Sequence, residues 1–65
     1  MTRAVVRFEP FMNYRRAKFR AYQLRKRLWF TTWVYLAELE PSEKNTLMDE
    51  MRKVYDEVVE VPYVE

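Results

Sequence analysis

The sequence predicts a mainly α-helical protein, an antiparallel hairpin of two helices, from three observations. The chain has 65 residues, of which 49% are hydrophobic and 34% charged, a composition typical of one small folded domain. Apolar residues recur at helical spacing in two stretches, 14–39 and 42–60. Pro41 lies between them and leaves only a short connection, so the long first helix and the shorter second one are expected to turn back on each other.

Residues 1–10 are expected to form an extended arm or a short β-strand. Val5 and Val6 are β-branched and lie between two arginines, a pattern that favours extended backbone. Pro10 disfavours the helical region at the preceding residue, so a break is expected there. The first helix then begins either with Pro10 in its first turn or with Asn13 as its N-cap.

Each predicted helix carries an apolar stripe. In the first, Tyr14, Ala17, Ala21, Leu24, Leu28 and Tyr35 follow heptad spacing, and the second half of the helix is apolar nearly all round. Pro41 ends it, and Pro41 or Ser42 opens the second helix with Glu43 near its positive end. The expected core between the helices is Leu24, Leu28, Tyr35, Leu47, Met51, Val54 and Val58. Pro62 ends the second helix, and residues 61–65 form an extended tail.

The charges divide sharply along the chain. Residues 1–33 contain nine Lys or Arg and one acid, whereas residues 34–65 contain three Lys or Arg and nine acids. This division has two interpretations: a basic binding surface, or two elements that attract each other within one fold. For Arg25, Lys26 and Arg27 we favour pairing with the acidic helix at Asp56, Glu57 and Glu60.

The composition excludes several classes of function. The chain has no Cys, His or Gly, which removes a zinc site of Cys and His ligands, a thiol nucleophile, an imidazole base and a glycine-rich phosphate loop. It also removes a hairpin turn of the Asn-Gly type. No nucleophile with its base can be assembled from the remaining residues. We therefore expect no enzyme activity, no cofactor and no metal.

Two groups of residues are candidates for a binding surface. The first is the basic start of the long helix, where aromatic and basic residues alternate, a pattern typical of phosphate or protein contacts. The second is an aromatic band too large for one partner helix to cover. Together the candidates are Arg15, Arg16, Lys18, Phe19, Arg20, Trp29, Phe30 and Trp33.

The function that the sequence favours is a small, non-catalytic regulatory or interaction protein. We expect it to bind a larger protein as an adaptor, inhibitor or accessory subunit, or to form a homo-oligomer, through its Arg- and aromatic-rich helix. The alternative is a nucleic-acid-binding protein that contacts backbone phosphates through the same basic helix. No membrane partner is expected. The expected location is the cytoplasm, or the host cytoplasm if the chain is phage-encoded.

Overall fold

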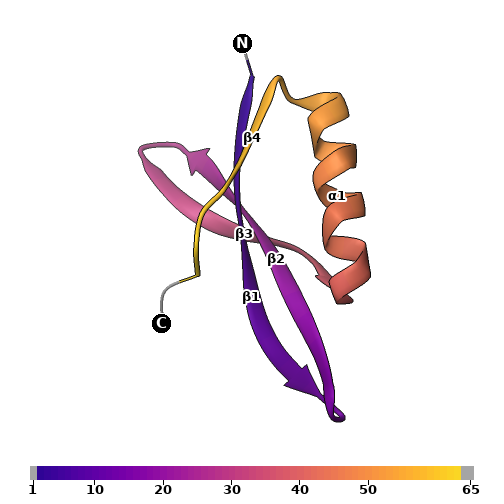
Figure 1. Ribbon diagram of the computed structural model, residues 1–65. Helices are drawn as coiled ribbons and strands as arrows, with labels where there is room; N and C mark the ends of the chain where they lie inside the picture. Colours follow the sequence, from indigo (N-terminus) through magenta and orange to yellow (C-terminus); the bar gives the residue numbers. More distant parts are fainter. Residues whose placement is uncertain (1, 64–65) are drawn as a thin grey trace.

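The computed structural model describes residues 2–63 and contains a four-stranded sheet with one helix, so the predicted two-helix hairpin is wrong (Figure 1). The fold class is α+β. The elements in chain order are β1 (Arg3–Asn13), β2 (Arg16–Arg27), β3 (Phe30–Leu39), α1 (Pro41–Val54) and β4 (Glu57–Glu60).

The sheet has the order β3-β2-β1-β4. Two consecutive hairpins form its antiparallel part, in which Phe8 lies opposite Ala21 and Leu24 lies opposite Trp33. β4 returns from the helix and pairs in parallel with the first part of β1, with Ala4 opposite Val58. The helix covers one face of the sheet, and the two hairpin turns extend beyond it in different directions (Figure 1).

Residues 14–39 form two strands instead of one long helix. They are rich in aromatic and β-branched residues, which favour strands. Their buried positions alternate with a period of two: Ala21 and Gln23 are buried, whereas Tyr22 between them and Leu24 after them are half-buried. A bulge at Leu36 shifts the register, so that Tyr22 lies opposite Tyr35 and Ala21 opposite Ala37. The apolar residues of this stretch fit both periods, and the heptad interpretation selected the wrong one.

The core lies between the helix and the covered face of the sheet. Its buried apolar residues are Ala4, Val6, Phe8, Ala21, Leu39, Met48 and Met51. Of the predicted core, Met51 is buried, and Leu47 and Val58 pack against the cluster from partly buried positions. Leu28, Tyr35 and Val54 are instead 80%, 54% and 73% exposed. Leu24 is half-buried in β2.

The expected start of the second helix is confirmed, and its expected end is wrong. Pro41 occupies the first turn, and the backbone N–H of Glu40 donates a hydrogen bond to Oε1 of Glu43 at 3.1 Å, as in a capping box. The helix ends at Val54, six residues before the predicted end at residue 60, because the chain there turns back to form β4. No helix within residues 2–63 is long and apolar enough to cross a membrane.

Of the two expectations for residues 1–10, an extended arm or a short strand, the structure contains a strand, and the expected break at Pro10 is wrong, because β1 continues to Asn13. β4 pairs only with Arg3–Val6, so at Pro10 β1 has a neighbour on one side. A strand with one neighbour accepts proline, since every second backbone nitrogen points away from that neighbour. Of the expected tail, Val61 donates a backbone hydrogen bond to Val6, and residues 64–65 lie outside the described part.

Candidate functional site

The end of the β2–β3 hairpin, residues 25–30, combines exposed apolar side chains with three exposed basic residues. Trp29 is 85% exposed, Leu28 80% and Phe30 48%. Leu28 has φ 50°, in the left-handed region that favours glycine. A large apolar residue held in this conformation costs about 1–2 kcal/mol. We call residues 25–30 the β2–β3 end.

The three cations of the β2–β3 end make no ion pair with any carboxylate within residues 2–63, which corrects the expected pairing with the acidic residues 56, 57 and 60. Nη2 of Arg25 donates a hydrogen bond to Oε1 of Gln23 at 3.3 Å. The acids that were expected to pair with them lie elsewhere: Glu60 lies 3.4 Å from Nζ of Lys44, and Asp56 accepts a hydrogen bond from the backbone of Thr2.

The opposite end of the sheet is the β1–β2 turn, which carries the first group of predicted site residues. Tyr14 is 94% exposed, and Tyr14 and Arg15 have φ 50° and 65°. Arg16 reaches Glu40 across 3.9 Å, and both side chains are mostly exposed, so this pair adds little stability. β2 has 12 residues and spans roughly 36 Å at about 3.3 Å per residue. The structure therefore separates Arg15 and Arg16 from Trp29 and Phe30.

The remaining predicted site residues lie on both faces of β2 and β3. Phe19 faces the core and packs edge-on against Phe8, with ring centroids 6.4 Å apart. Arg20 lies 3.3 Å from Glu9 and stacks 4.1 Å from the ring centroid of Phe11. Lys18 lies opposite Phe11 in the sheet. Trp33 lies opposite Leu24, on the face that the helix leaves uncovered.

That uncovered face contains a cluster that sequence reasoning missed. The guanidinium carbon of Arg7 lies 4.4 Å from the ring centroid of Trp33, 5.3 Å from that of Tyr22 and 5.5 Å from that of Tyr63. The Arg7 Nε is buried and has no hydrogen-bond partner within the described residues. Period-two alternation along residues 5–11 was the signal that could have found this cluster.

Glu9 links the cluster to Arg20. The Tyr22 hydroxyl donates a hydrogen bond to Oε2 of Glu9 at 3.2 Å, while Oε1 of Glu9 faces Arg20. Burial raises the pKa of Tyr22, and the hydrogen bond and the negative charge of Glu9 raise it further, against smaller opposing effects of Arg20 and Arg7. Arg7 and Arg20 stack on aromatic rings of this face, so their cationic groups already have contacts within the protein.

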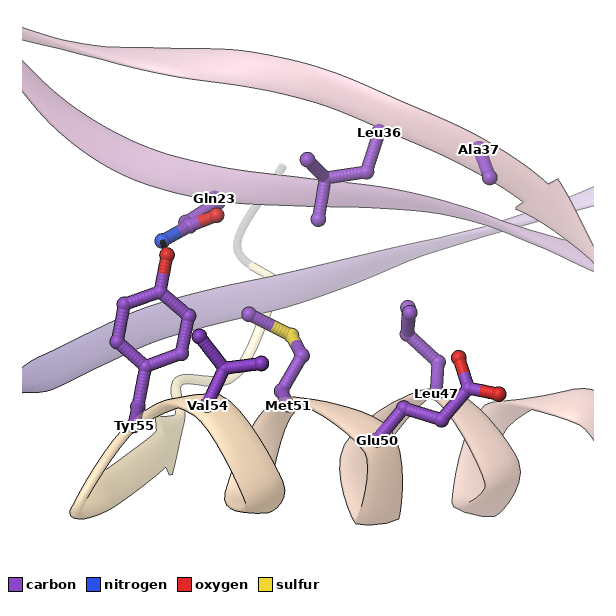
Figure 2. A pocket seen from close by; sticks show the side chains of 8 residues that line it. All are labelled: Gln23, Leu36, Ala37, Leu47, Glu50, Met51, Val54 and Tyr55. Atoms are coloured by element: carbon purple, nitrogen blue, oxygen red, sulfur yellow. Dashed lines mark hydrogen bonds between the residues drawn. The ribbon is translucent and has the colours of Figure 1, made fainter.

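A third feature is an apolar groove of about 370 Å³ between α1 and β3 (Figure 2). Leu36 and Ala37 face Leu47, Met51 and Val54 across it. Nε2 of Gln23 and the hydroxyl of Tyr55 close one end with a hydrogen bond of 3.1 Å. The carboxylate of Glu50 is the one charged group in the lining. The groove lies on the same side of the sheet as the helix, next to the bulge of β3.

The described residues contain no group of three or more acidic side chains that could hold a metal ion. Comparison with known proteins found no matching family model, no similar curated protein and no similar solved structure.

Proposed function

We propose that the protein is a non-catalytic binding protein that inserts its β2–β3 end into a pocket on a larger protein. The observation that carries this proposal is the exposure of Trp29 in a turn whose other residue, Leu28, has a left-handed backbone conformation. The contact is made by a hairpin and not by the helix that the sequence suggested. It keeps Trp29 and Phe30 of the predicted site but uses Arg25, Lys26 and Arg27 in place of Arg15, Arg16, Lys18 and Arg20.

The energetics of the turn support a role in binding. Leu28 has a left-handed backbone, and Leu28 and Trp29 are 80% and 85% exposed, so packing within residues 2–63 covers little of either side chain. Strained backbone and exposed aromatic side chains cluster at functional sites. Tryptophan buries about 150–250 Å² when it enters a pocket and is among the residue types that contribute most to protein interfaces. Binding would therefore bury the apolar surface of Trp29 that folding leaves exposed to water.

The surrounding cations indicate what the partner surface contains. Arg25, Lys26 and Arg27 are exposed and unpaired with any described carboxylate. Charges at the rim of an interface speed association and select partners of opposite charge. We propose a partner with an apolar pocket surrounded by acidic residues.

Nucleic-acid binding is the second candidate, and the distribution of cations along β2 favours it. Seven basic residues lie between Arg15 and Arg27, and exposed cations along a strand can follow a phosphate backbone. This candidate predicts affinity that falls steeply with salt. An interface anchored by Trp29 changes much less with salt, because most of its free energy comes from apolar burial.

The test compares the two hairpin turns of the protein, one of which carries Trp29 and the other Tyr14. Trp29→Ser and the control Tyr14→Ser each remove one highly exposed aromatic ring from a hairpin turn. The partner is recovered from nuclease-treated extract of the source cell with the wild-type chain and purified, and its affinity for each variant is measured by calorimetry at two salt concentrations.

We expect Trp29→Ser to weaken binding by roughly 30-fold or more, since an anchor residue of an interface contributes about 2 kcal/mol or more. Tyr14→Ser should bind as the wild type does. Equal affinities of the two variants would refute the proposal, and recovery that disappears with nuclease would favour the nucleic-acid candidate.

A cytoplasmic location is part of this proposal. Imaging of the tagged chain in the source cell tests it, and a signal confined to the membrane or to the medium would contradict it.

A further inference from the structure

The two edges of the sheet differ in how well they are protected. β4 has four residues, begins and ends with glutamate, and is followed by Pro62. β3 has ten residues, and residues 30–37 contain no charge, no proline and no glycine. Short length, charges and proline are the features that prevent a strand edge from pairing with another chain. β3 has none of these over its first eight residues, and the bulge at Leu36 leaves the segment 30–35 regular.

We propose that segment 30–35 of β3 pairs with the same segment of a second copy, so that two chains form one continuous sheet. The inference rests on the proposed function, because it names a second copy as one protein that covers the β2–β3 end. Main-chain hydrogen bonds to an open edge strand are a recurrent mode of recognition. The segment contains Phe, Trp, Val, Tyr and two Thr, all strand-favouring residues that suit such pairing.

The symmetry of the pair follows from the edge geometry. Two copies joined edge to edge by a two-fold axis normal to the sheet pair in antiparallel fashion and keep both helices on the same face. Residues opposite each other must then have side chains on the same face of the sheet. The two-fold axis therefore passes beside a single residue, which lies opposite its own copy, and in this segment that residue is Thr32 or Trp33. The numbers of two opposed residues accordingly add up to 64 or 66.

This register places Trp29 of one copy beside the groove of the other. Trp29 directly precedes β3 and lies near residues 35–37 of the second copy, which include Leu36 and Ala37 of the groove lining. Edge hydrogen bonds and apolar contact thus both agree with a second copy as the occupant.

The pairing also regulates the proposed function. Trp29 that is covered in the dimer cannot bind a larger partner, so formation of the dimer competes with formation of the partner complex. Partner binding is then expected to weaken as the concentration of the protein rises above the dissociation constant of the dimer.

Two threonine variants test the dimer. Thr31→Glu places a negative charge on each copy near the two-fold axis, where like charges repel, and within its own chain the new carboxylate faces Lys26 across the hairpin. Thr46→Glu makes the same change at an exposed position of α1. Sedimentation equilibrium of the full chain gives the dimer dissociation constant of wild type and both variants. Hydrogen exchange of the amides of residues 30–35 is followed over the same range of concentration.

We expect a dimer that is weakened at least about tenfold by Thr31→Glu and unchanged by Thr46→Glu, with exchange of the segment 30–35 slowing as concentration rises. A monomer at concentrations up to about 1 mM, equal dimers of the two variants, or exchange independent of concentration would each overturn the proposal. If the protein is a monomer but still needs Trp29 to bind a larger partner, the dimer is refuted and the proposed function stands. If the protein forms the dimer but binds a larger partner without Trp29, the proposed function is refuted and the dimer stands.

Discussion

At the scale of single residues, the hairpin turns are the most unusual feature of this chain. Tyr14, Arg15 and Leu28 have positive φ values of 50°, 65° and 50°. Two-residue hairpin turns normally use Gly, Asn or Asp at such positions, because a Cβ atom raises the energy of the left-handed conformation. A chain without glycine makes both turns with large side chains, and each turn exposes an aromatic ring.

The β1–β2 turn should therefore be easy to stabilise. Tyr14→Asn/Arg15→Gly gives the turn the residues that its geometry prefers, and we expect the free energy of unfolding to rise by about 1–2 kcal/mol. Urea denaturation followed by tryptophan fluorescence measures this change. Arg16→Gly is the matched control, since it places glycine one residue later inside β2, where it should lower stability by about 0.5–1 kcal/mol. The same sign in both variants would show that backbone conformation is not the cause.

Tyr22 provides a test of the uncovered face. Its pKa is raised first by burial and then by the hydrogen bond and charge of Glu9. We expect Glu9→Gln to lower the pKa of Tyr22, as measured by NMR from the Cζ shift of that ring during titration. Because the pKa is higher in the folded state, the contribution of Tyr22 to stability should be fully present below its ordinary pKa of about 10 and should be lost as the pH rises through its raised pKa. A Tyr22 pKa that does not respond to Glu9→Gln would contradict the described contact.

At the scale of elements, strands and helix obtain their stability from different sources. The start of α1 is set by its own sequence, with Pro41 in its first turn and the Glu43 side chain accepting a hydrogen bond from the backbone of Glu40. β1 is supported by partners distant in sequence, since Val6 lies opposite Gln23 on one side and Glu60 on the other. The apolar side chains that matter for stability are therefore those between sheet and helix.

Two substitutions separate the observed core from the predicted one. Phe8 is 5% exposed, and Phe8→Ala should cost about 3–5 kcal/mol, enough to unfold much of a domain of this size. Leu28 is 80% exposed, and Leu28→Ala should change the free energy of unfolding by no more than about 0.5 kcal/mol. Thermal denaturation followed by circular dichroism measures both. A Leu28→Ala chain that unfolds would place Leu28 in the core, as the heptad pattern predicted.

At the scale of the whole molecule, most of the positive charge lies in the first two strands. Nine of the twelve Lys and Arg lie within residues 1–33, which the structure places in β1, β2 and their turns. The four ion pairs within residues 2–63 engage only two of these cations, Arg16 and Arg20. Arg15 at one end of β2 and Arg25, Lys26 and Arg27 at the other make no ion pair within these residues, so they are available for binding.

Charge reversal at each end identifies which one binds. We expect Arg25→Glu/Arg27→Glu to weaken the affinity for the larger partner by roughly tenfold or more, while Arg15→Glu/Arg16→Glu leaves it nearly unchanged. Both variants should keep their thermal midpoint, because exposed charges contribute little to stability. Calorimetric titration with the purified partner and thermal denaturation give the two quantities. Loss of binding only in the Arg15 and Arg16 variant would move the site to the β1–β2 turn.

Sequence alone determined the properties that depend on neighbouring residues. Pro41 and Glu43 predicted where a helix begins, Val5 and Val6 predicted extended backbone, and the charge division is visible in the order of the residues. The candidate residues Trp29 and Phe30 were also found from sequence, because large apolar side chains in excess of a small core must be exposed or bound.

Tertiary structure alone decided what residues 14–39 become. Their apolar residues fit a helical and a strand period, and the turn at Leu28 and Trp29 that divides them carries no Gly, Asn, Asp or Pro to mark it. Which period prevails depends on contacts between distant segments: Phe8 with Phe19 from the next strand, and Arg3 with Glu57 from the other end of the chain. Such pairings lower the free energy only after the chain has folded back on itself, so no local pattern encodes them.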